Sequence, residues 1–228
     1  AEGNINADRL ITMLNVKNDE LVLEEKGIYS VEKFIVARRL MYWQVYLHKT
    51  SLAAERILIE TLKRAKELIG KAIEVPASNS LKFFLTHKAD KNNFDQDVLI
   101  RYLKLDDYDV IFALKQWCDH QDFILSYLSG SIINRKLPKV EMQKEDFTDS
   151  YMQQKKDLVM RKYSLDKNDI DYLVFKGKVW NKAYSTTESG ISILMKNGEV
   201  TDLADASDQL NIRALSDPVT KYFMCYPK

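Results

Sequence analysis

The sequence has few of the residues that break regular secondary structure or cross-link a fold. Its 228 residues include seven glycines, four prolines and two cysteines. So little glycine and proline favours long helices over many short strands joined by tight turns. Cys118 and Cys225 lie far apart, and neither belongs to a CxxC or CxxH pattern, so a disulfide framework or a zinc site is not expected. A reducing, cytoplasmic setting is therefore the expectation.

Net charge and long apolar runs are lacking as well. The 34 basic and 33 acidic residues leave a formal net charge of +1, so no overall field attracts nucleic acid or a membrane surface. No apolar run approaches the ~20 residues needed to cross a bilayer. Hydrophobic residues still make up 46% of the chain and charged residues 29%, the balance of a globular protein. We expect a folded protein without a membrane or nucleic-acid partner.

Residues 1–130 are predicted to form a helical domain with one very long helix. Ser30 is a candidate N-cap, and the pattern from there to Ile69 is helical without a breaker. Gly70 suits the position after the end of this helix. A linker at 75–79 follows. Shorter helices are expected at 80–88, 95–103, 107–118 and 121–128.

Residues 131–228 are predicted to form an α+β lobe. Short segments with a β-branched and aromatic bias predict strands at 137–142, 172–175, 191–195 and 222–226. Amphipathic segments predict helices at 145–163 and 205–215. The order strand, helix, strand, strand, helix, strand matches the ferredoxin-like topology. The expected fold class is α+β, with a mainly helical domain followed by a ferredoxin-like lobe.

Motifs that announce catalysis are scarce in this sequence. It contains no P-loop, dinucleotide-binding or nucleophile-elbow pattern. The three histidines, His48, His87 and His120, do not have the paired spacing of metal ligands. The aspartates between 106 and 109 could bind a cation, but helix capping explains them more simply. We expect no metal site in this chain.

The segment 38–49 has a more specific character. Arg38 lies on a partly apolar side of the predicted helix, and a half-buried guanidinium needs an anion. Tyr42 and Tyr46 are four residues apart and are expected to stack on one side. The residues alone leave open whether the anion is a protein carboxylate or a phosphate.

The run R-x-x-M-Y-x-x-V-Y-x-H-K, from Arg38 to Lys49, resembles a helix of the HD-domain deoxynucleotide triphosphohydrolases and their bacterial relatives. Residues 4–11, 21–27 and 221–227 also look like parts of that family. The resemblance implies hydrolysis of nucleotides at a divalent metal held by an H…HD…D set. In the family this set precedes the helix with which the chain starts. The metal is therefore expected in a separate HD core, no cofactor is expected in this chain, and the fragment is not expected to be active by itself.

The resemblance also implies binding residues. The set expected at the phosphates of a substrate is Arg38, Tyr46, His48 and Lys49. In regulated members a nucleotide effector binds between subunits, and the corresponding basic positions are Lys26, Arg135 and Lys139. Asn15 stands where those enzymes carry a further basic residue. The expected partners are a dNTP- or GTP-like nucleotide, as substrate or effector, and further copies of the chain in a homo-oligomer.

Three functions follow from these patterns. The leading hypothesis is the C-terminal assembly and regulatory portion of an HD-superfamily nucleotide phosphohydrolase. The alternative is a non-enzymatic module that senses a nucleotide or binds another protein. The third, an independent metalloenzyme that uses His87, His120 and nearby aspartates, has the least support because those residues lack a ligand pattern.

Overall fold

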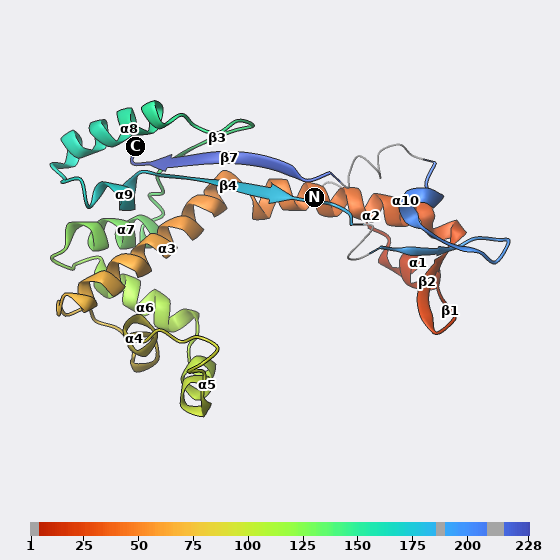
Figure 1. Cartoon of the computed structure of the whole chain (residues 1–228), viewed down its shortest axis with the longest axis horizontal. Helices are drawn as coiled ribbons and strands as arrows, with labels where there is room; N and C mark the ends of the chain where they lie inside the picture. Colours follow the sequence, from red (N-terminus) through yellow and green to blue (C-terminus); the bar gives the residue numbers. More distant parts are fainter. Residues whose placement is uncertain (1–4, 186–189, 209–216) are drawn as a thin grey trace. The chain divides into compact units, whose positions relative to one another are not determined.

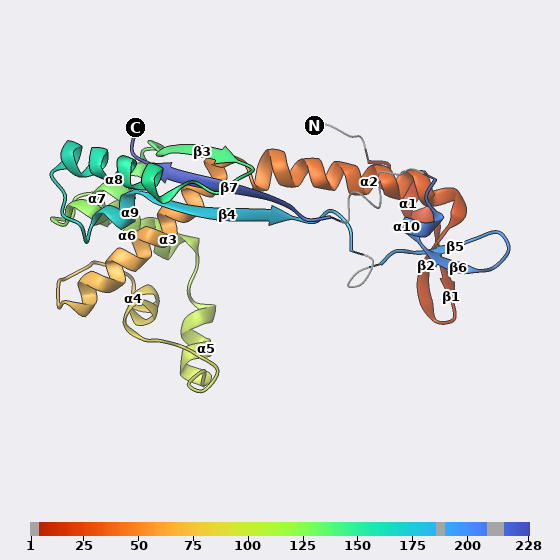
Figure 2. The same ribbon diagram turned by 45° about the horizontal axis from the view of Figure 1, so that its top comes forward.

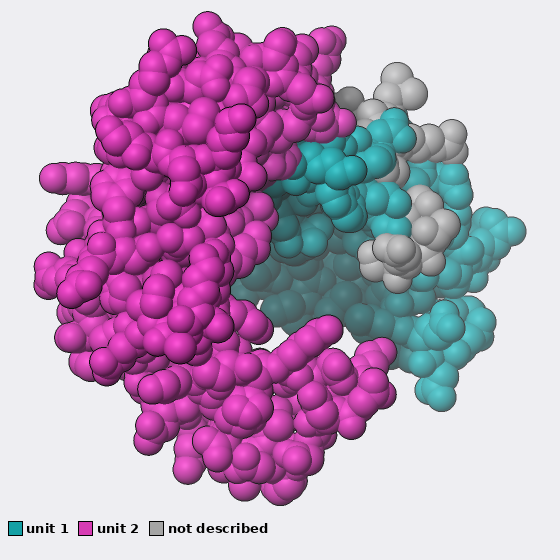
Figure 3. Space-filling view, turned by 60° about the vertical axis from the view of Figure 1, so that its left-hand side comes forward, with its two compact units in different colours: residues 1–48, 178–221 teal, residues 49–177, 222–228 magenta. Residues whose placement is uncertain are grey.

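The computed structural model describes residues 5–185, 190–208 and 217–228 (Figures 1 and 2). The chain divides into two compact units. Unit 1 comprises residues 1–48 and 178–221, and unit 2 comprises residues 49–177 and 222–228 (Figure 3). This division differs from the predicted boundary near residue 130. The reason is that pairing between distant segments defines the units, and local periodicity does not record such pairing.

Unit 1 contains a small mixed sheet. Strands β1 (Leu14–Lys17) and β2 (Glu20–Glu24) form an antiparallel hairpin, and Asn18 and Asp19 make its turn with positive φ angles of 53° and 66°. Strand β2 pairs in parallel with β5 (Ser192–Leu194), and β5 pairs antiparallel with β6 (Val200–Asp202). The short helices α1 (Ala7–Thr12) and α10 (Leu203–Ala206) also belong to unit 1.

The predicted helix from 30 to 69 is not continuous. A short 3₁₀ turn, η1 (Glu25–Gly27), leads into α2 (Ile28–Met41), which is followed by the π-helical turn η2 (Tyr42–Tyr46) and then by α3 (Lys49–Gly70). The backbone N–H of Leu47 bonds the carbonyl of Tyr42 at 2.7 Å, five residues back, which is the hydrogen bond of a π turn. Apolar spacing runs across this interruption, so periodicity alone predicts one helix.

Four shorter helices follow α3 in unit 2. They are α4 (Asn79–Thr86), α5 (Gln96–Leu103), α6 (Asp107–Trp117) and α7 (Phe123–Ile133), close to the predicted ranges. Two of them, α4 and α7, contact α3 directly. The N-terminus of each helix is capped by a side chain, which is Ser78 for α4, Asp95 for α5, Asp106 for α6 and Asp122 for α7. The capping role expected for the aspartates at 106–109 is confirmed, since Asp106 and Asp109 form a reciprocal capping box.

A three-stranded sheet is formed by β3 (Lys139–Gln143), β7 (Val219–Tyr226) and β4 (Phe175–Asn181), in the order β3-β7-β4, and the strands lie side by side in both ribbon views. Strand β3 belongs to unit 2, whereas β4 and β7 each contain residues of both units, which divide after Gly177 and after Lys221. Strand β3 pairs antiparallel with β7, from Lys139 opposite Tyr226 to Gln143 opposite Tyr222. Helices α8 (Asp149–Tyr163) and α9 (Ile170–Leu173) contribute Val159, Ile170 and Leu173 to the core that also contains Met224.

The α+β class is confirmed, but the ferredoxin-like arrangement is wrong. The strands predicted at 137–142, 191–195 and 222–226 fall in two sheets, because β5 joins β1, β2 and β6 whereas β3 and β7 belong to the other sheet with β4. An alternating pattern identifies a strand but not its partner, which explains the error. The strand predicted at 172–175 is wrong, since this segment contains the end of α9 and only the first residue of β4. Of the helix predicted at 205–215, Asp205 and Ala206 belong to the short helix α10, Ser207 is extended, and residues 209–215 lie outside the described part of the chain. In the part of the chain that the structure describes, no helix is long and apolar enough to cross a membrane.

Gly177 in β4 offers a first test of the packing. A Cβ atom at this position would lie 2.7 Å from the ring of Phe223, whose side chain is buried. Gly177→Ala is expected to lower the free energy of unfolding by about 1–3 kcal/mol, because the ring must shift within a packed core. The matched control is Gly70→Ala, since nothing lies within 4 Å of a Cβ there and alanine suits a helix. Equal urea midpoints for the two variants would contradict this packing.

Candidate functional site

A pocket in unit 2 collects four cationic side chains. It is lined by Lys49, Arg135, Lys139 and Lys228, and its volume is ≈ 330 Å³. This volume lies at the lower end of the range found for small-ligand sites. The other lining residues are small or apolar: Thr50, Ala53, Leu137, Pro138 and Val140.

Three structural features bring these cations together. Lys49 is the first residue of α3. Arg135 follows the end of α7 with a left-handed φ of 54°, and its N–H bonds the carbonyl of Ile132 at 3.1 Å. This turn reverses the chain, so that Lys139 begins β3. The spacing from Arg135 to Lys139 thus crosses a helix end, a turn and a strand start.

Two tyrosines and a glutamate hold Lys139 in place. The Lys139 Nζ atom lies 3.3 Å from Glu141 Oε1 and 5.6 Å from the centre of the Tyr226 ring. A hydrogen bond with Tyr226, assisted by Glu141, raises the pKa of the exposed Lys139 ammonium. The Tyr151 hydroxyl donates to Glu141 at 2.9 Å, and the Tyr226 hydroxyl donates to the same carboxylate. Burial alone would raise the pKa of Glu141, but the hydrogen bonds that its carboxylate accepts outweigh this effect and lower that pKa. Glu141 and Lys139 therefore both stay charged.

The pocket carries an excess of positive charge. Only Lys139 among its four cations forms an ion pair with a carboxylate in the described part of the chain. Lys49, Arg135 and Lys228 have no such partner among those residues. Clustered cations with few counter-charges raise the local concentration of anions and suit phosphate groups. The chemistry that this arrangement can perform is the binding of a polyanion.

Arg38, the first residue of the predicted substrate-phosphate set, lies in unit 1. Its Nη1 donates to the carbonyl of Ala183 at 3.2 Å, and its guanidinium lies 5.0 Å from the centre of the Tyr42 ring. The Tyr42 and Tyr46 rings are in contact, with centroids 5.2 Å apart, as expected from their spacing. Arg38 also lines a pocket of ≈ 360 Å³ with Trp180 and Lys182. Its role at a phosphate stays a prediction.

The structure groups the predicted residues differently from the sequence. Lys49, expected in the substrate set, lines the same pocket as Arg135 and Lys139 of the effector set. The helix is interrupted between these two groups of residues. Helix α2 and the π turn η2 belong to unit 1, whereas Lys49 is the first residue of α3 in unit 2. The other members of both sets, Arg38, Tyr46, His48 and Lys26, belong to unit 1. Asn15 also lies there, and its side-chain amide donates to Glu24 at 3.3 Å.

Lys228 is a pocket residue that sequence reasoning missed. It belongs to no motif, and only the pairing of β7 with β3 brings it beside Lys139. The Nζ atom of Lys162 donates to its carbonyl. A charged residue two positions after a predicted strand was the only available signal.

The remaining histidines have structural partners. The Nδ1 atom of His120 accepts the backbone N–H of Asp122 at 2.9 Å, so Nε2 carries the proton and donates to the carbonyl of Glu74 at 3.0 Å. His87 stacks on Phe83 with centroids 4.3 Å apart. Within residues 5–185, 190–208 and 217–228, no group of three His, Cys, Asp or Glu side chains could hold a metal ion. The described residues do not fit a catalytic metal.

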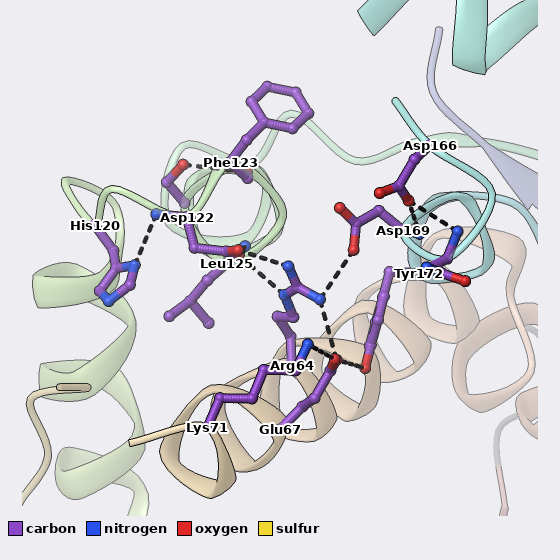
Figure 4. A network of polar contacts seen from close by, with 12 residues as sticks. Arg64, Glu67, Lys71, His120, Asp122, Phe123, Leu125, Asp166, Asp169 and Tyr172 are labelled. Atoms are coloured by element: carbon purple, nitrogen blue, oxygen red, sulfur yellow. Dashed lines mark hydrogen bonds and ion pairs between the residues drawn. The ribbon is translucent and has the colours of Figure 1, made fainter. Parts of the chain in front are cut away.

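Arg64 is a buried cation whose partners are all within the protein (Figure 4). Its guanidinium makes two bonds to Asp122, of 3.1 and 2.6 Å, and it lies 2.9 Å from Asp169 and 3.0 Å from Glu67. The Tyr172 hydroxyl also donates to Glu67, at 2.6 Å. This network joins α3 to the start of α7 and to α9, and it has a structural role.

Comparisons with known proteins agree with the observed fold. Residues 5–78 match the family described as the HD-associated region. The uncharacterized protein YwfO of Bacillus subtilis is 33% identical over 135 residues, which are 59% of this chain and 30% of that protein. An uncharacterized protein of Mycoplasma pneumoniae is 22% identical over 196 residues, which are 82% of this chain and 44% of that protein.

Two solved structures extend these likenesses. A phosphohydrolase from Bacteroides thetaiotaomicron has a TM-score of 0.92 and 43% identity, and the match covers 100% of this chain and 57% of that one. A hypothetical protein from Aquifex aeolicus has a TM-score of 0.59 at 19% identity, covering 99% of this chain and 49% of that one, and this likeness shows the fold alone. The chain spans less than two thirds of each of these relatives.

Proposed function

We propose that this chain, in which residues 5–78 match the HD-associated region, is the regulatory and assembly portion of a nucleotide phosphohydrolase. In this proposal the basic pocket of unit 2 holds the phosphates of a dNTP- or GTP-like nucleotide. The observation that carries the proposal is the convergence of Lys49, Arg135, Lys139 and Lys228 on one pocket.

The chemistry of the pocket suits a polyphosphate. A guanidinium such as that of Arg135 presents a planar fork that matches phosphate oxygens, whereas lysines act as point charges around it. The pocket volume of ≈ 330 Å³ is small, so the phosphates fill it and the base lies outside. The resemblance described above suggests a second copy of the chain as the surface for that base.

The proposal divides labour between this region and an HD domain. A divalent metal bound by the HD domain would supply an activated water and polarise the phosphate. The residues of this chain bind the phosphates, orient the nucleotide and link its binding to assembly. The 43% identical relative is a phosphohydrolase, which supports the general reaction class for the parent protein.

Arg135→Ala tests the proposed pocket. Hydrogen bonds to charged groups contribute about 1.5–3 kcal/mol each, so we expect this variant to bind dGTP about 10- to 100-fold more weakly. Lys139→Ala should have a similar or smaller effect, because Glu141 already neutralises part of that charge. The measurement is isothermal titration calorimetry with dGTP and, separately, with inorganic tripolyphosphate.

Lys136→Ala is the matched control. Lys136 is exposed and adjacent to Arg135 but does not line the pocket, so its loss should change the Kd less than about threefold. If dGTP binds equally well to the Arg135→Ala and Lys136→Ala variants, the phosphates do not occupy this pocket.

A further inference from the structure

Helix α6 is apolar on two opposite sides. On its inner side, where the helix packs against α4 and α7, Ala113, Leu114 and Trp117 are buried. On its outer side, Tyr108 and Phe112 follow each other after one helical turn and are 83% and 53% exposed. A surface helix ordinarily carries polar residues on its outer side, and a helix that is apolar all round is covered on both sides. The outer side of α6 therefore has the composition of a contact surface.

Three exposed side chains form a surface that we call the outer stripe of α6. They are Tyr108, Ile111 and Phe112, and their spacing of three and four residues places them next to one another on the helix. Single exposed apolar side chains are ordinary on a protein, but several on one face of a helix mark a site of contact with another protein. Aromatic residues are enriched at the centres of such contacts. The outer stripe thus suits a protein partner.

Charged residues of opposite sign lie at the two ends of the outer stripe. Asp107 is in the first turn of α6 and Lys115 is in its last turn, and both are exposed. Within the part of the chain that the structure describes, neither of them forms an ion pair. Ile111 lies midway between them, one helical turn from each. Both charges are therefore open to a partner on another surface.

This charge pattern is complementary to a second copy of itself. When two α6 helices pack antiparallel around a two-fold axis at Ile111, Lys115 of each copy lies opposite Asp107 of the other. The apolar side chains between the charged ends then pack against each other and lose their contact with water. A parallel arrangement would place like charges opposite each other, which is unfavourable. The pattern therefore favours one partner, a second copy of the chain, and one orientation.

We propose that the outer stripe of α6 is a dimerisation surface, on which a second copy of the chain packs with its own α6 antiparallel. This inference rests on the assembly role proposed above and names a surface for it. The surface shares no residue with the basic pocket, so association and phosphate binding can be measured separately. A contact through one helix from each copy is small, so we expect a Kd of about 1–100 µM for the dimer.

Sedimentation equilibrium of the whole chain without nucleotide, at about 2–200 µM, measures the association. Phe112→Asp places an unpaired charge in the centre of the contact and is expected to raise the Kd of the dimer at least about 30-fold, the effect of losing one central residue. Leu158→Asp is the matched control. It puts the same charge in place of an exposed apolar side chain on α8, and should change the Kd less than about threefold.

Exchange of the two charges tests the antiparallel arrangement. Lys115→Asp alone places like charges opposite each other at both ends of the contact and should weaken the dimer at least about tenfold, as should Asp107→Lys alone. The double variant restores both pairs, so its Kd should return to within about threefold of the wild-type value. Each substitution opposes the helix dipole, so mere damage to α6 would make the double variant worse than either single variant. Rescue therefore reports pairing between the copies.

Three results would overturn the proposal, and they separate its failure from that of the assembly role. A chain that remains a monomer at about 200 µM removes the assembly role together with this surface. A dimer that Phe112→Asp does not weaken leaves the assembly role in place and removes the surface. A double charge variant that associates no better than Lys115→Asp removes the antiparallel pairing. Arg135→Ala should leave the Kd of the dimer unchanged, since Arg135 belongs to the basic pocket.

Discussion

Arg64→Met is expected to lower the free energy of unfolding by about 3–5 kcal/mol, the cost of breaking a buried ion pair by removing one partner. Only 8% of the Arg64 side chain is exposed, and its guanidinium is the shared partner of Asp122, Asp169 and Glu67. Methionine has a similar length but provides no counter-charge. Asp122 also caps α7 by accepting the backbone N–H of Leu125 at 2.8 Å, so its displacement loosens that helix start as well.

The effect of Arg64→Met should depend on pH. Hydrogen bonds from Lys71 and Tyr172, together with the charge of Arg64, lower the pKa of Glu67 to about 2. Burial opposes ionisation of Asp122, but its bonds to Arg64 still lower the pKa of that carboxyl. Since both folded pKa values lie below the unfolded ones, near 4, this stabilisation is complete above about pH 5 and is lost as the pH falls toward 2. The difference between wild type and variant should therefore narrow in acid.

Urea unfolding followed by circular dichroism at pH 7 and pH 3 measures both effects. The matched control is Arg101→Met, because Arg101 forms an exposed pair with Asp97 at 2.8 Å on a single helix and should change stability by less than about 0.5 kcal/mol. Arg64→Lys should fall between the two, since it keeps the charge but not the two bonds to Asp122. A loss at pH 7 no larger for Arg64→Met than for Arg101→Met would show that the network contributes little.

Local features of the fold were predictable because their causes lie within a few residues. The helix starts at Asp106 and Asp122 follow from short polar side chains that satisfy the first N–H groups. The Asn197-Gly198 pair predicts a tight turn, and Gly198 adopts a φ of 85° between β5 and β6. The class of the fold is the sum of such local signals.

Pairing between distant segments was not predictable in the same way. Strand β5 joins β2 in parallel, with Ile193 opposite Leu23, across about 170 residues of sequence. Nothing in the alternation of either segment specifies that partner. The π turn at Tyr42–Tyr46 was missed for a related reason, since it shifts the hydrogen-bond ladder by one residue without disturbing the apolar pattern.

For the candidate sites too, local spacing was predictable from the sequence and contacts between distant segments were not. The spacing of Arg135 and Lys139 was visible in the sequence, whereas the addition of Lys49 and Lys228 depends on how α3 and β7 pack in unit 2. Trp180 and Lys182 were not singled out, because a tryptophan in a strand is ordinarily a core residue and only its 63% exposure marks it as a surface feature. Site residues that come from separate elements require the fold before they can be recognised.

Trp117→Ala is the second substitution with a large expected effect on stability. Trp117 is fully buried in a core with Leu68, Leu114 and Leu125, and its Nε1 donates to the carbonyl of Pro76 at 2.7 Å. Truncating a buried tryptophan costs about 3–5 kcal/mol, because apolar contacts are lost and a cavity remains. The carbonyl of Pro76 also loses its donor, so we expect a loss at the upper end of this range.

Trp117→Phe separates packing from the hydrogen bond. Phenylalanine keeps an aromatic ring in the core but has no N–H for Pro76, so the loss should be about 1–3 kcal/mol. Circular dichroism is the suitable probe for urea unfolding, because both substitutions remove a fluorophore. Unfolding by two compact units need not be two-state, so the loss should be read from the transition of unit 2. If alanine and phenylalanine destabilise that transition equally, the Pro76 bond rather than the buried ring holds α6 against the 75–79 segment.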